Sequence, residues 1–252
     1  MIFFRVIPII LIENKDCIKT FQYNKKKYLG DPINIIKIFN DLGVDEIIIL
    51  NLDNEIIDYE YFRLLSEESF VPLSFGGGIK NIESIKKILS LGYEKIILNS
   101  ALYKNINFLN DAIKEFGSST ISVSINIKKN FFGNYYVYDY FEKKILKHMK
   151  LENCYEILNQ IEPGELIFNF VDFEGTRNGY DFLKIDEIIQ NNVGKNIVIN
   201  GGAKNFTDIL ELKKRSISGA AASSLFSFMG SNDAVLINYL DQNQKKILDG
   251  KN

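Results

Sequence analysis

Short apolar segments alternate with longer amphipathic segments along almost the whole chain, and most are bounded by Gly, Pro or Asn. This alternation is typical of parallel β-strands that are each followed by a helix. Such units form either an open doubly wound sheet or a closed barrel. The pattern predicts eight strands, at Phe4–Ile12, Glu46–Leu52, Val71–Phe75, Lys95–Asn99, Ile121–Ile127, Glu165–Val171, Asn196–Asn200 and Gly219–Ser223.

Helices are predicted between these strands. The segment Pro32–Leu42 is one example, because Asp31 is a good N-cap, proline suits the first helical position and Gly43 suits the end. The aromatic run FFGNYYVYDY, at Phe131–Tyr140, breaks the alternation. Its Gly-Asn pair predicts a β-hairpin, inserted near residues 128–146 after the fifth strand.

An internal repeat favours the closed barrel. The segment GGGIKNIESIKKILSLGYEKIILNSAL returns as NGGAKNFTDILELKKRSISGAAASSLF, so that Gly78 aligns with Gly202 and Ser100 with Ser224, 124 positions apart. DEIIILNLD is likewise similar to GELIFNFVD, 119 positions later. Two similar halves of four βα units each predict a (β/α)8 TIM barrel with a two-fold half-barrel repeat.

The composition is compatible with this fold. The chain has 252 residues, 46% of them hydrophobic and 25% charged, with a formal charge of −2. A single α/β barrel commonly has about 250 residues, and no linker divides the chain, so we expect one domain over residues 1–252. The near-neutral charge argues against nucleic acid as a partner.

Cysteine and histidine are scarce. Cys17, Cys154 and His148 cannot form a disulfide framework or a four-ligand zinc site, so we expect no bound metal and a reduced, cytoplasmic protein. The apolar N-terminal stretch Ile2–Ile12 contains Arg5 and is shorter than the roughly 20 residues of a membrane helix. We therefore expect no membrane span.

Glycines and hydroxyl residues recur at the predicted carboxyl ends of four strands, where such barrels carry their active sites. Glycine lets backbone amides approach an anion, and a helix N-terminus favours negative charge. The alternative is that the glycines only turn the chain, but their duplication favours two anion sites for a phosphorylated small molecule. The residues are Gly76, Gly77, Gly78, Asn99 and Ser100 in one half, and Gly201, Gly202, Ser223 and Ser224 in the other.

Two further groups of charged residues have open interpretations. The stretch from Glu13 to Gly30 reads as a long loop, which is either a functional lid over an anionic ligand or a solvated basic loop. Its basic residues are Lys15, Lys19, Lys25, Lys26 and Lys27. At the opposite end of the barrel, four charges begin strands and either face water or pair across the axis. They are Arg5, Glu46, Lys95 and Glu165.

With these residues placed, the whole chain resembles the HisF family, the cyclase subunit of imidazole glycerol phosphate synthase. The most specific matches are two motifs in the expected order on the expected strands. They are DFEGTRNGYD at Asp172–Asp181 and NGGA at Asn200–Ala203, supported by RVIPII from Arg5, GDP at Gly30–Pro32, FGGGI at Phe75–Ile79, LNSA at Leu98–Ala101 and FGS at Phe116–Ser118.

The resemblance implies a barrel that binds a HisH-like glutaminase at its N-terminal face and conducts ammonia to a bisphosphate substrate at the other face, without a cofactor. Arg5, Glu46, Lys95 and Glu165 coincide with the family's ammonia gate, and Lys19 with its lid lysine. The phosphate sites coincide with Gly78, Ser100, Gly202 and Ser224. Other top-face positions are Asn51, Asp172, Glu174, Gly175 and Thr176.

The sequence departs from the family where the chemistry is done. The general acid and base of the family are aspartates at the ends of the first and fifth strands, and this chain has Leu11 and Asn126 there. Leucine cannot transfer a proton and an amide does not titrate. Asn51 and Glu174 also replace aspartates, and Glu13, two residues beyond Leu11, is a candidate substitute base. The chain's own lyase activity should therefore be crippled.

Three functional hypotheses follow. In the first, a HisF-like paralogue activates a glutaminase and conducts ammonia to a sugar amidotransferase in the synthesis of bacterial surface glycans, lipopolysaccharide or flagellar. In the second, the chain is the ordinary cyclase of histidine biosynthesis. In the third, it is a scaffold for the glutaminase and conducts nothing.

Overall fold

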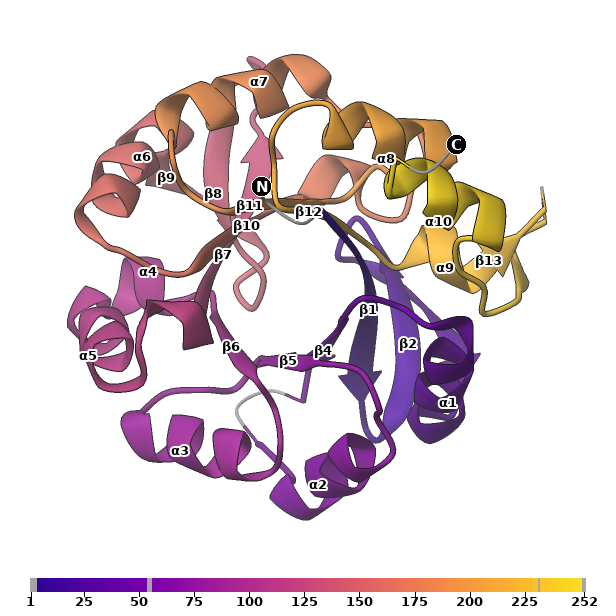
Figure 1. Cartoon of the computed structure of the whole chain (residues 1–252). Helices are drawn as coiled ribbons and strands as arrows, with labels where there is room; N and C mark the ends of the chain where they lie inside the picture. Colours follow the sequence, from indigo (N-terminus) through magenta and orange to yellow (C-terminus); the bar gives the residue numbers. More distant parts are fainter. Residues whose placement is uncertain (1–3, 54–55, 231, 251–252) are drawn as a thin grey trace.

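Eight parallel strands close into a barrel, which confirms the predicted fold (Figure 1). The computed structural model describes residues 4–53, 56–230 and 232–250, so Ile2 and the chain ends of the predicted domain lie outside the described residues. Pairing of β7 with β10 completes the ring. Its strands are β1 (Arg5–Glu13), β4 (Ile47–Asn51), β5 (Leu73–Gly76), β6 (Lys95–Leu98), β7 (Ile121–Lys129), β10 (Glu165–Phe170), β11 (Ile197–Asn200) and β12 (Gly219–Ala222).

Helices surround the barrel (Figure 1). In α1, the side chain of Asp31 accepts from the Asn34 N–H and Gly43 ends the helix at φ 59°, as the sequence predicted. The helices are α1 (Pro32–Leu42), α2 (Tyr59–Glu67), α3 (Ile82–Ser90), α4 (Ala101–Lys104), α5 (Ile106–Phe116), α6 (Leu151–Gln160), α7 (Phe182–Asn191), α8 (Phe206–Lys213), α9 (Ser224–Ser227), α10 (Gln242–Leu248), η1 (Ser118–Thr120) and η2 (Val171–Phe173).

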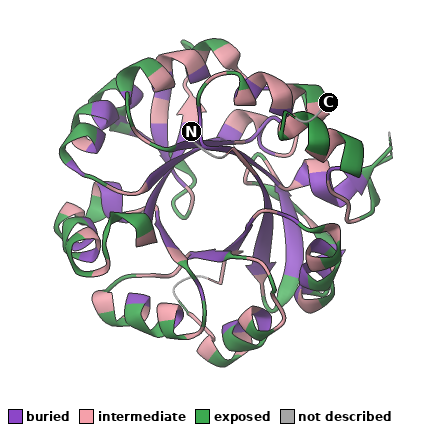
Figure 2. Cartoon of the chain, viewed as in Figure 1, coloured by how far each residue is buried: buried purple, intermediate pink, exposed green. Residues whose placement is uncertain are grey.

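The ring of strands separates two cores, one inside the barrel and one under the helices, because successive side chains of a strand point to opposite faces. On β1, Val6 and Ile10 pack outward against the helices, whereas Ile7, Ile9 and Leu11 point into the barrel. The barrel strands are accordingly buried along most of their length, while the outer faces of the helices are exposed (Figure 2). The fold therefore places a separate layer of inward side chains along the barrel axis.

The stretch that the sequence analysis treated as a long loop is a β-hairpin, and this expectation was wrong. β2 (Asp16–Phe21) pairs antiparallel with the end of β1 and with β3 (Lys25–Gly30). The prediction failed because the turn contains no glycine: Gln22 and Tyr23 themselves adopt φ values of 52° and 58°. A role as a lid remains a prediction.

A second antiparallel extension follows the fifth barrel strand. β7 continues past the barrel to Lys129 and pairs with β8 (Tyr135–Asp139), which pairs with β9 (Lys144–Lys150). Near the C-terminal end, β13 (Phe228–Met229) pairs with β14 (Ala234–Val235). Both hairpins that extend β1 and β7 project from the carboxyl ends of the strands, so they lie beside the mouth of the barrel.

Within the described ranges, none of the helices combines the length and the apolar character that a membrane span requires.

Candidate functional site

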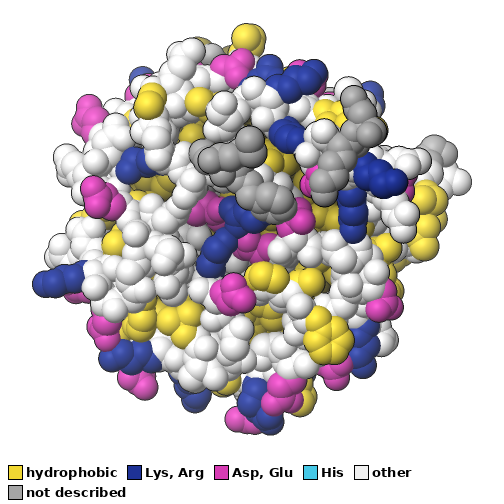
Figure 3. Space-filling view, in the orientation of Figure 1, with side chains coloured by type: hydrophobic (Ala, Val, Ile, Leu, Met, Phe, Trp, Pro, Cys, Tyr) yellow, Lys and Arg dark blue, Asp and Glu magenta, His cyan; other side chains and the backbone are white. Residues whose placement is uncertain are grey.

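The four charged residues predicted at the base of the barrel meet there. Arg5 contacts both Glu46 and Glu165, and the Lys95 ammonium lies 2.9 Å from a Glu46 carboxylate oxygen. The side chains of Glu46 and Glu165 are only 4% and 6% exposed. Acidic and basic side chains lie together at the centre of the face seen in Figure 3, over the barrel axis. The residues therefore pair across the axis and do not simply face water.

Electrostatics favour the ionised form of this cluster. Burial alone would raise the pKa of Glu46, but Lys95 and Arg5 outweigh it, so that the pKa lies below its usual value. The Ser74 hydroxyl, which the sequence analysis did not identify, donates to the other Glu46 oxygen at 2.5 Å. At neutral pH the base of the barrel is thus closed by a hydrogen-bonded, charged layer.

We expect this layer to weaken in acid. Because the pKa of Glu46 is lowered in the folded state, its contribution to stability is complete above about pH 5 and is lost as the pH falls through the lowered pKa. Urea unfolding at pH 7 should show a deficit on the order of 2 kcal/mol for Glu46→Gln, and the deficit should shrink as the pH falls through the lowered pKa. The exposed Glu60→Gln serves as the control. A deficit that does not change as the pH is lowered through the acid range would contradict the expectation.

Above the charged layer the barrel interior is mainly apolar. Most of the inward side chains form one cluster that is separate from the core under the helices, and the buried Ser122 and Ser124 of β7 lie at the same level. A mainly apolar layer offers little to a charged solute, whereas a small neutral molecule crosses it at lower cost. Its members are Ile7, Ile9, Leu11, Ile18, Ile48, Ile97, Ile167, Val198 and Ala221, with Leu50 and Leu52 packed against them.

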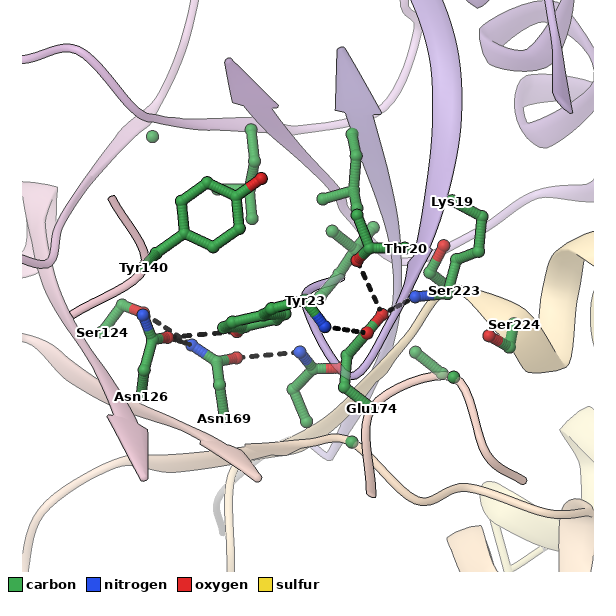
Figure 4. A pocket seen from close by; sticks show the side chains of 18 of the residues that line it. Lys19, Thr20, Tyr23, Ser124, Asn126, Tyr140, Asn169, Glu174, Ser223 and Ser224 are labelled. Atoms are coloured by element: carbon green, nitrogen blue, oxygen red, sulfur yellow. Dashed lines mark hydrogen bonds and ion pairs between the residues drawn. The ribbon is translucent and has the colours of Figure 1, made fainter. Parts of the chain in front are cut away.

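At the mouth, the carboxyl ends of neighbouring strands present a cluster of amides, which we call the amide cluster: Asn99, Asn126, Asn169 and Asn200. Figure 4 labels Asn126 and Asn169. The Asn200 Nδ2 donates to Asn169 Oδ1 at 2.8 Å, and Asn169 Nδ2 donates to Asn126 Oδ1 at 2.9 Å. Asn169 also donates to Ser124 Oγ at 2.7 Å. These residues line a pocket at the strand ends.

The β2–β3 hairpin closes over this pocket and is held by Glu174. The Glu174 carboxylate contacts the Lys19 ammonium and accepts from Thr20 Oγ1 at 3.2 Å and from the Tyr23 N–H at 3.1 Å (Figure 4). Burial lowers the pKa of Lys19 to about 7, and the nearby Cys17 opposes this shift. The Tyr23 hydroxyl donates to Asn126 Oδ1 at 3.1 Å. Lys19 is thus paired with Glu174 and helps to hold the hairpin in place.

Removing the Glu174 carboxylate should free the hairpin. Glu174→Ala loses three contacts, and a loss of about 2 kcal/mol of local stability corresponds to roughly 30-fold faster hydrogen exchange of the β2 and β3 amides. Glu13→Ala is the matched control, because it removes only the partly exposed pair with Lys26 on the same hairpin. Equal exchange rates in the two variants, measured by NMR, would show that Glu174 does not hold the hairpin.

The two predicted anion sites differ in the structure. Gly201, Gly202, Ser223 and Ser224 all line the pocket, whereas Gly78 does not. From that half, Gly76, Gly77 and Asn99 line the pocket and Ser100 does not. The repeat in the sequence therefore gives two unequal sites.

The positions that correspond to the family's catalytic pair carry no titratable group. Leu11 is 8% exposed and forms part of the apolar pocket wall, and Asn126 belongs to the amide cluster. Glu13 does lie on the same strand, since β1 extends to it. It pairs with Lys26 and is absent from the pocket lining, so it is not placed as a substitute base.

The remaining top-face predictions have structural partners. Asn51 is buried and its side chain bridges the Asp53 N–H and the Ile56 carbonyl. Asp172 accepts from the Lys129 N–H at 2.8 Å. The Thr176 hydroxyl donates to the Phe173 carbonyl oxygen and does not line the pocket. Gly175 lines the pocket and packs against the β2–β3 hairpin.

Sequence reasoning missed Tyr23, Ser124, Asn169 and Asn200. Asn200 ends a predicted strand and Asn169 lies two residues before the end of another, so their position was a usable signal, although amides near strand ends are common turn residues. Ser124 lies two residues before Asn126 on β7, so the two side chains share a face of the strand, and Ser124 could have been found in the same way. Tyr23 reaches the pocket only through the hairpin fold, and no pattern in the sequence predicts that.

A barrel with charged residues closing its base, a mainly apolar interior and glycine-lined cradles at its mouth is the architecture of a small-molecule enzyme or of a subunit derived from one. Comparisons give its family. A family model described as "Histidine biosynthesis protein" matches residues 5–231. The chain belongs to this family and, within it, to the HisF proteins.

Relatives cover nearly the whole chain. A Pseudomonas aeruginosa protein that carries the imidazole glycerol phosphate synthase subunit name hisF2 is 36% identical over 245 residues, 95% of this chain and 97% of its own length. One from Vibrio vulnificus named hisF3 is 36% identical over 250 residues, 96% and 95% of the two chains. The imidazole glycerol phosphate synthase subunit HisF of Alkaliphilus metalliredigens is 29% identical over 233 residues, 90% and 92%.

Proposed function

We propose that this chain is the barrel subunit of a glutamine-dependent amidotransferase. It binds a HisH-like glutaminase at its N-terminal face, receives ammonia there and conducts it along the barrel to the mouth. The layer of paired charges at the base carries this proposal, because Arg5, Glu46, Lys95 and Glu165 lie together across the axis at the entrance. The neutral, mainly apolar layer above them suits ammonia rather than ammonium.

The same geometry argues against ring closure by this chain. The cyclase needs a general acid and a general base at the strand ends, and Leu11 and Asn126 supply neither. Among the described residues that line the pocket, Glu174 supplies the carboxylate, and it is in contact with Lys19 and committed to the hairpin. We therefore infer that ammonia leaves the mouth for an acceptor other than the histidine precursor.

The acceptor proposed is a sugar held by a sugar amidotransferase of bacterial surface-glycan synthesis. The replacement of both catalytic aspartates by Leu11 and Asn126 supports an acceptor apart from histidine synthesis. The alternative is the authentic cyclase subunit, favoured by the retained phosphate cradle at Gly201 and Gly202. A scaffold that conducts no ammonia would not need charged residues at the bottom of the barrel.

Reconstitution with a HisH-like glutaminase tests the proposal. The chain should raise glutamate formation from glutamine by at least about tenfold, an allosteric coupling in the usual range. Lys95→Ala should keep the complex intact by gel filtration and should reduce the transfer of glutamine nitrogen to the acceptor. Undiminished transfer in Lys95→Ala would favour the scaffold, and no activation of the glutaminase would overturn the proposal.

A further inference from the structure

The hairpin between β7 and β8 ends in an aromatic turn that is exposed to solvent. Phe131 and Phe132 occupy this turn, with exposed fractions of 98% and 83%. Single apolar side chains on a surface are common, but two adjacent phenylalanines add a large apolar area to the surface and nothing to the core. Such a pair is typical of a surface that another molecule covers.

The backbone of this turn is ordered by hydrogen bonds. The Asn130 side chain accepts from the Phe132 N–H at 2.9 Å and from the Asn134 N–H at 3.0 Å, and the Asn130 carbonyl accepts from the Gly133 N–H at 3.0 Å. The rings of Phe131 and Phe132, which we call the aromatic tip, lie edge to face with their centroids 5.6 Å apart. Because the tip is already ordered, a partner that binds it loses little conformational entropy.

The exposed apolar surface continues from the aromatic tip onto α7. Leu183, in the first turn of α7, is 86% exposed. Its neighbours Asp181 and Lys184 both contact Tyr135, the first residue of β8. The Tyr135 hydroxyl donates to Asp181 at 2.9 Å, and the Lys184 ammonium lies 5.3 Å from the centroid of the Tyr135 ring. Leu183 therefore lies beside the hairpin, and two elements contribute to one apolar surface.

The strands that carry the aromatic tip are basic. Residues 128–150, which we call the β7–β9 extension, contain six lysines against two acids, although the whole chain has a formal charge of −2. Lys143, Lys147 and Lys150 are exposed, and within the described part of the chain none of them pairs with an acid. Lysines on an edge strand such as β9 discourage strand addition, so a partner meets side chains here. Their charge favours a partner with an acidic surface.

The other end of the β7–β9 extension reaches the mouth of the barrel. Tyr140 and Phe141, which follow β8, line the pocket, and the ring centroids of Tyr140 and Tyr23 are 5.3 Å apart. β8 has five residues, so about 17 Å of strand separates the tip from the mouth. A small domain is about 30 Å across. A protein bound at the tip is therefore wide enough to cover the mouth as well.

Delivery of ammonia from the mouth requires such a cover. Ammonia that leaves the mouth into water is diluted, and at neutral pH most of it takes up a proton and is no longer a nucleophile. An acceptor site held against the mouth avoids both losses, because bulk water is excluded from the transfer. This requirement favours a protein over a membrane as the occupant of the surface.

We propose that the protein that accepts the ammonia docks on the aromatic tip and Leu183, with an acidic surface against the lysines of β9 and its own active site over the mouth. The inference rests on the proposed function, which makes this protein a sugar amidotransferase. The two phenylalanine rings enter an apolar pocket of the partner and supply most of the affinity. Lys143, Lys147 and Lys150 form the charged rim of the interface.

The affinity of the purified full chain for the sugar amidotransferase of the same organism, measured by biolayer interferometry, tests the docking surface. Phe131→Ser combined with Phe132→Ser should weaken the complex at least about 30-fold, because buried aromatic anchors dominate such interfaces. Phe70→Ser is the matched control, since Phe70 is 88% exposed but precedes β5 at the opposite face of the barrel. It should bind as the wild type does.

A charge reversal tests the rim of the same surface. Lys147→Glu should weaken the complex about fivefold at low salt, and the loss should shrink as the ionic strength rises, because exposed charges are screened. Lys114→Glu, at an exposed lysine of α5, is the control and should not change the affinity. All the substituted side chains are exposed or lie at the surface, so urea unfolding of each variant should match that of the wild type.

Three results would overturn the inference. The first is an unchanged affinity in the double phenylalanine variant, or an equal loss in Phe70→Ser. The second is a wild-type chain that activates the glutaminase and does not bind the amidotransferase. The third is another occupant: the double variant loses self-association in sedimentation velocity, or loses binding to vesicles of phosphatidylcholine and phosphatidylglycerol, and still binds the amidotransferase.

These outcomes are distinguishable from a failure of the proposed function. Activation of the glutaminase is measured without the amidotransferase, so it reports on the base of the barrel alone. Its absence would overturn the proposed function, whereas loss of selectivity between the variants of the aromatic tip and Phe70→Ser would overturn the docking surface only.

Discussion

We expect this chain, supplied with ammonia and the phosphoribulosyl formimino ribonucleotide substrate, to form imidazole glycerol phosphate at least about 10⁴-fold more slowly than a HisF that has both aspartates. A positioned general acid or base typically contributes about 10²–10⁴ in rate. Both positions lack one here, since Leu11 is an apolar wall residue and Asn126 is bonded to Asn169 and Tyr23. Product formation is measured by mass spectrometry over hours.

The HisF of Alkaliphilus metalliredigens, a relative at 29% identity, is the positive control for the substrate and the assay. Because the effects of residues that act as a unit do not multiply, the loss is stated as a lower bound. Turnover by this chain within about tenfold of the control would contradict the account and would establish the chain as an ordinary cyclase.

The second large effect concerns stability. Arg5→Met should lower the free energy of unfolding by about 3–5 kcal/mol, because it leaves the buried carboxylates of Glu46 and Glu165 without their shared cation. Lys95 remains beside Glu46, so Glu165 is the residue most affected. Urea unfolding at pH 7, followed by circular dichroism, measures the change.

Arg63→Met is the matched control, because Arg63 also contacts two glutamates, Glu60 and Glu67, but does so on an exposed helix surface. Exposed ion pairs contribute little to stability because water screens them, so this variant should unfold nearly as the wild type does. Equal losses in Arg5→Met and Arg63→Met would mean that the base of the barrel is solvated and that no closed charged layer exists.

Much of the fold could be predicted from the sequence. The apolar alternation located all eight barrel strands, because strand formation follows local periodicity. The internal repeat favoured closure of the sheet into a barrel. The four charges at the base were found because each begins a strand. Their pairing across the axis depends on closure of the sheet, and so it could be stated only as one of two alternatives.

The mouth was harder to predict. The β2–β3 hairpin was missed because Gln22 and Tyr23 occupy a left-handed turn without glycine, an arrangement held by Glu174 from the sixth barrel strand's loop. Its stability is therefore a tertiary effect. The repeat predicted two equal anion sites. It could not reveal that Gly78 and Ser100 lie outside the pocket, since the pocket forms only in the folded chain.

Isotope tracing in the complete system tests the central claim most directly. The wild-type chain, its glutaminase and the sugar amidotransferase are supplied with glutamine labelled with ¹⁵N at the amide, in an excess of unlabelled ammonium. If ammonia travels through this barrel, the nitrogen in the aminated sugar comes from glutamine, and Lys95→Ala shifts it toward the bulk ammonium. A wild-type product whose nitrogen matches the bulk ammonium would contradict conduction through the barrel.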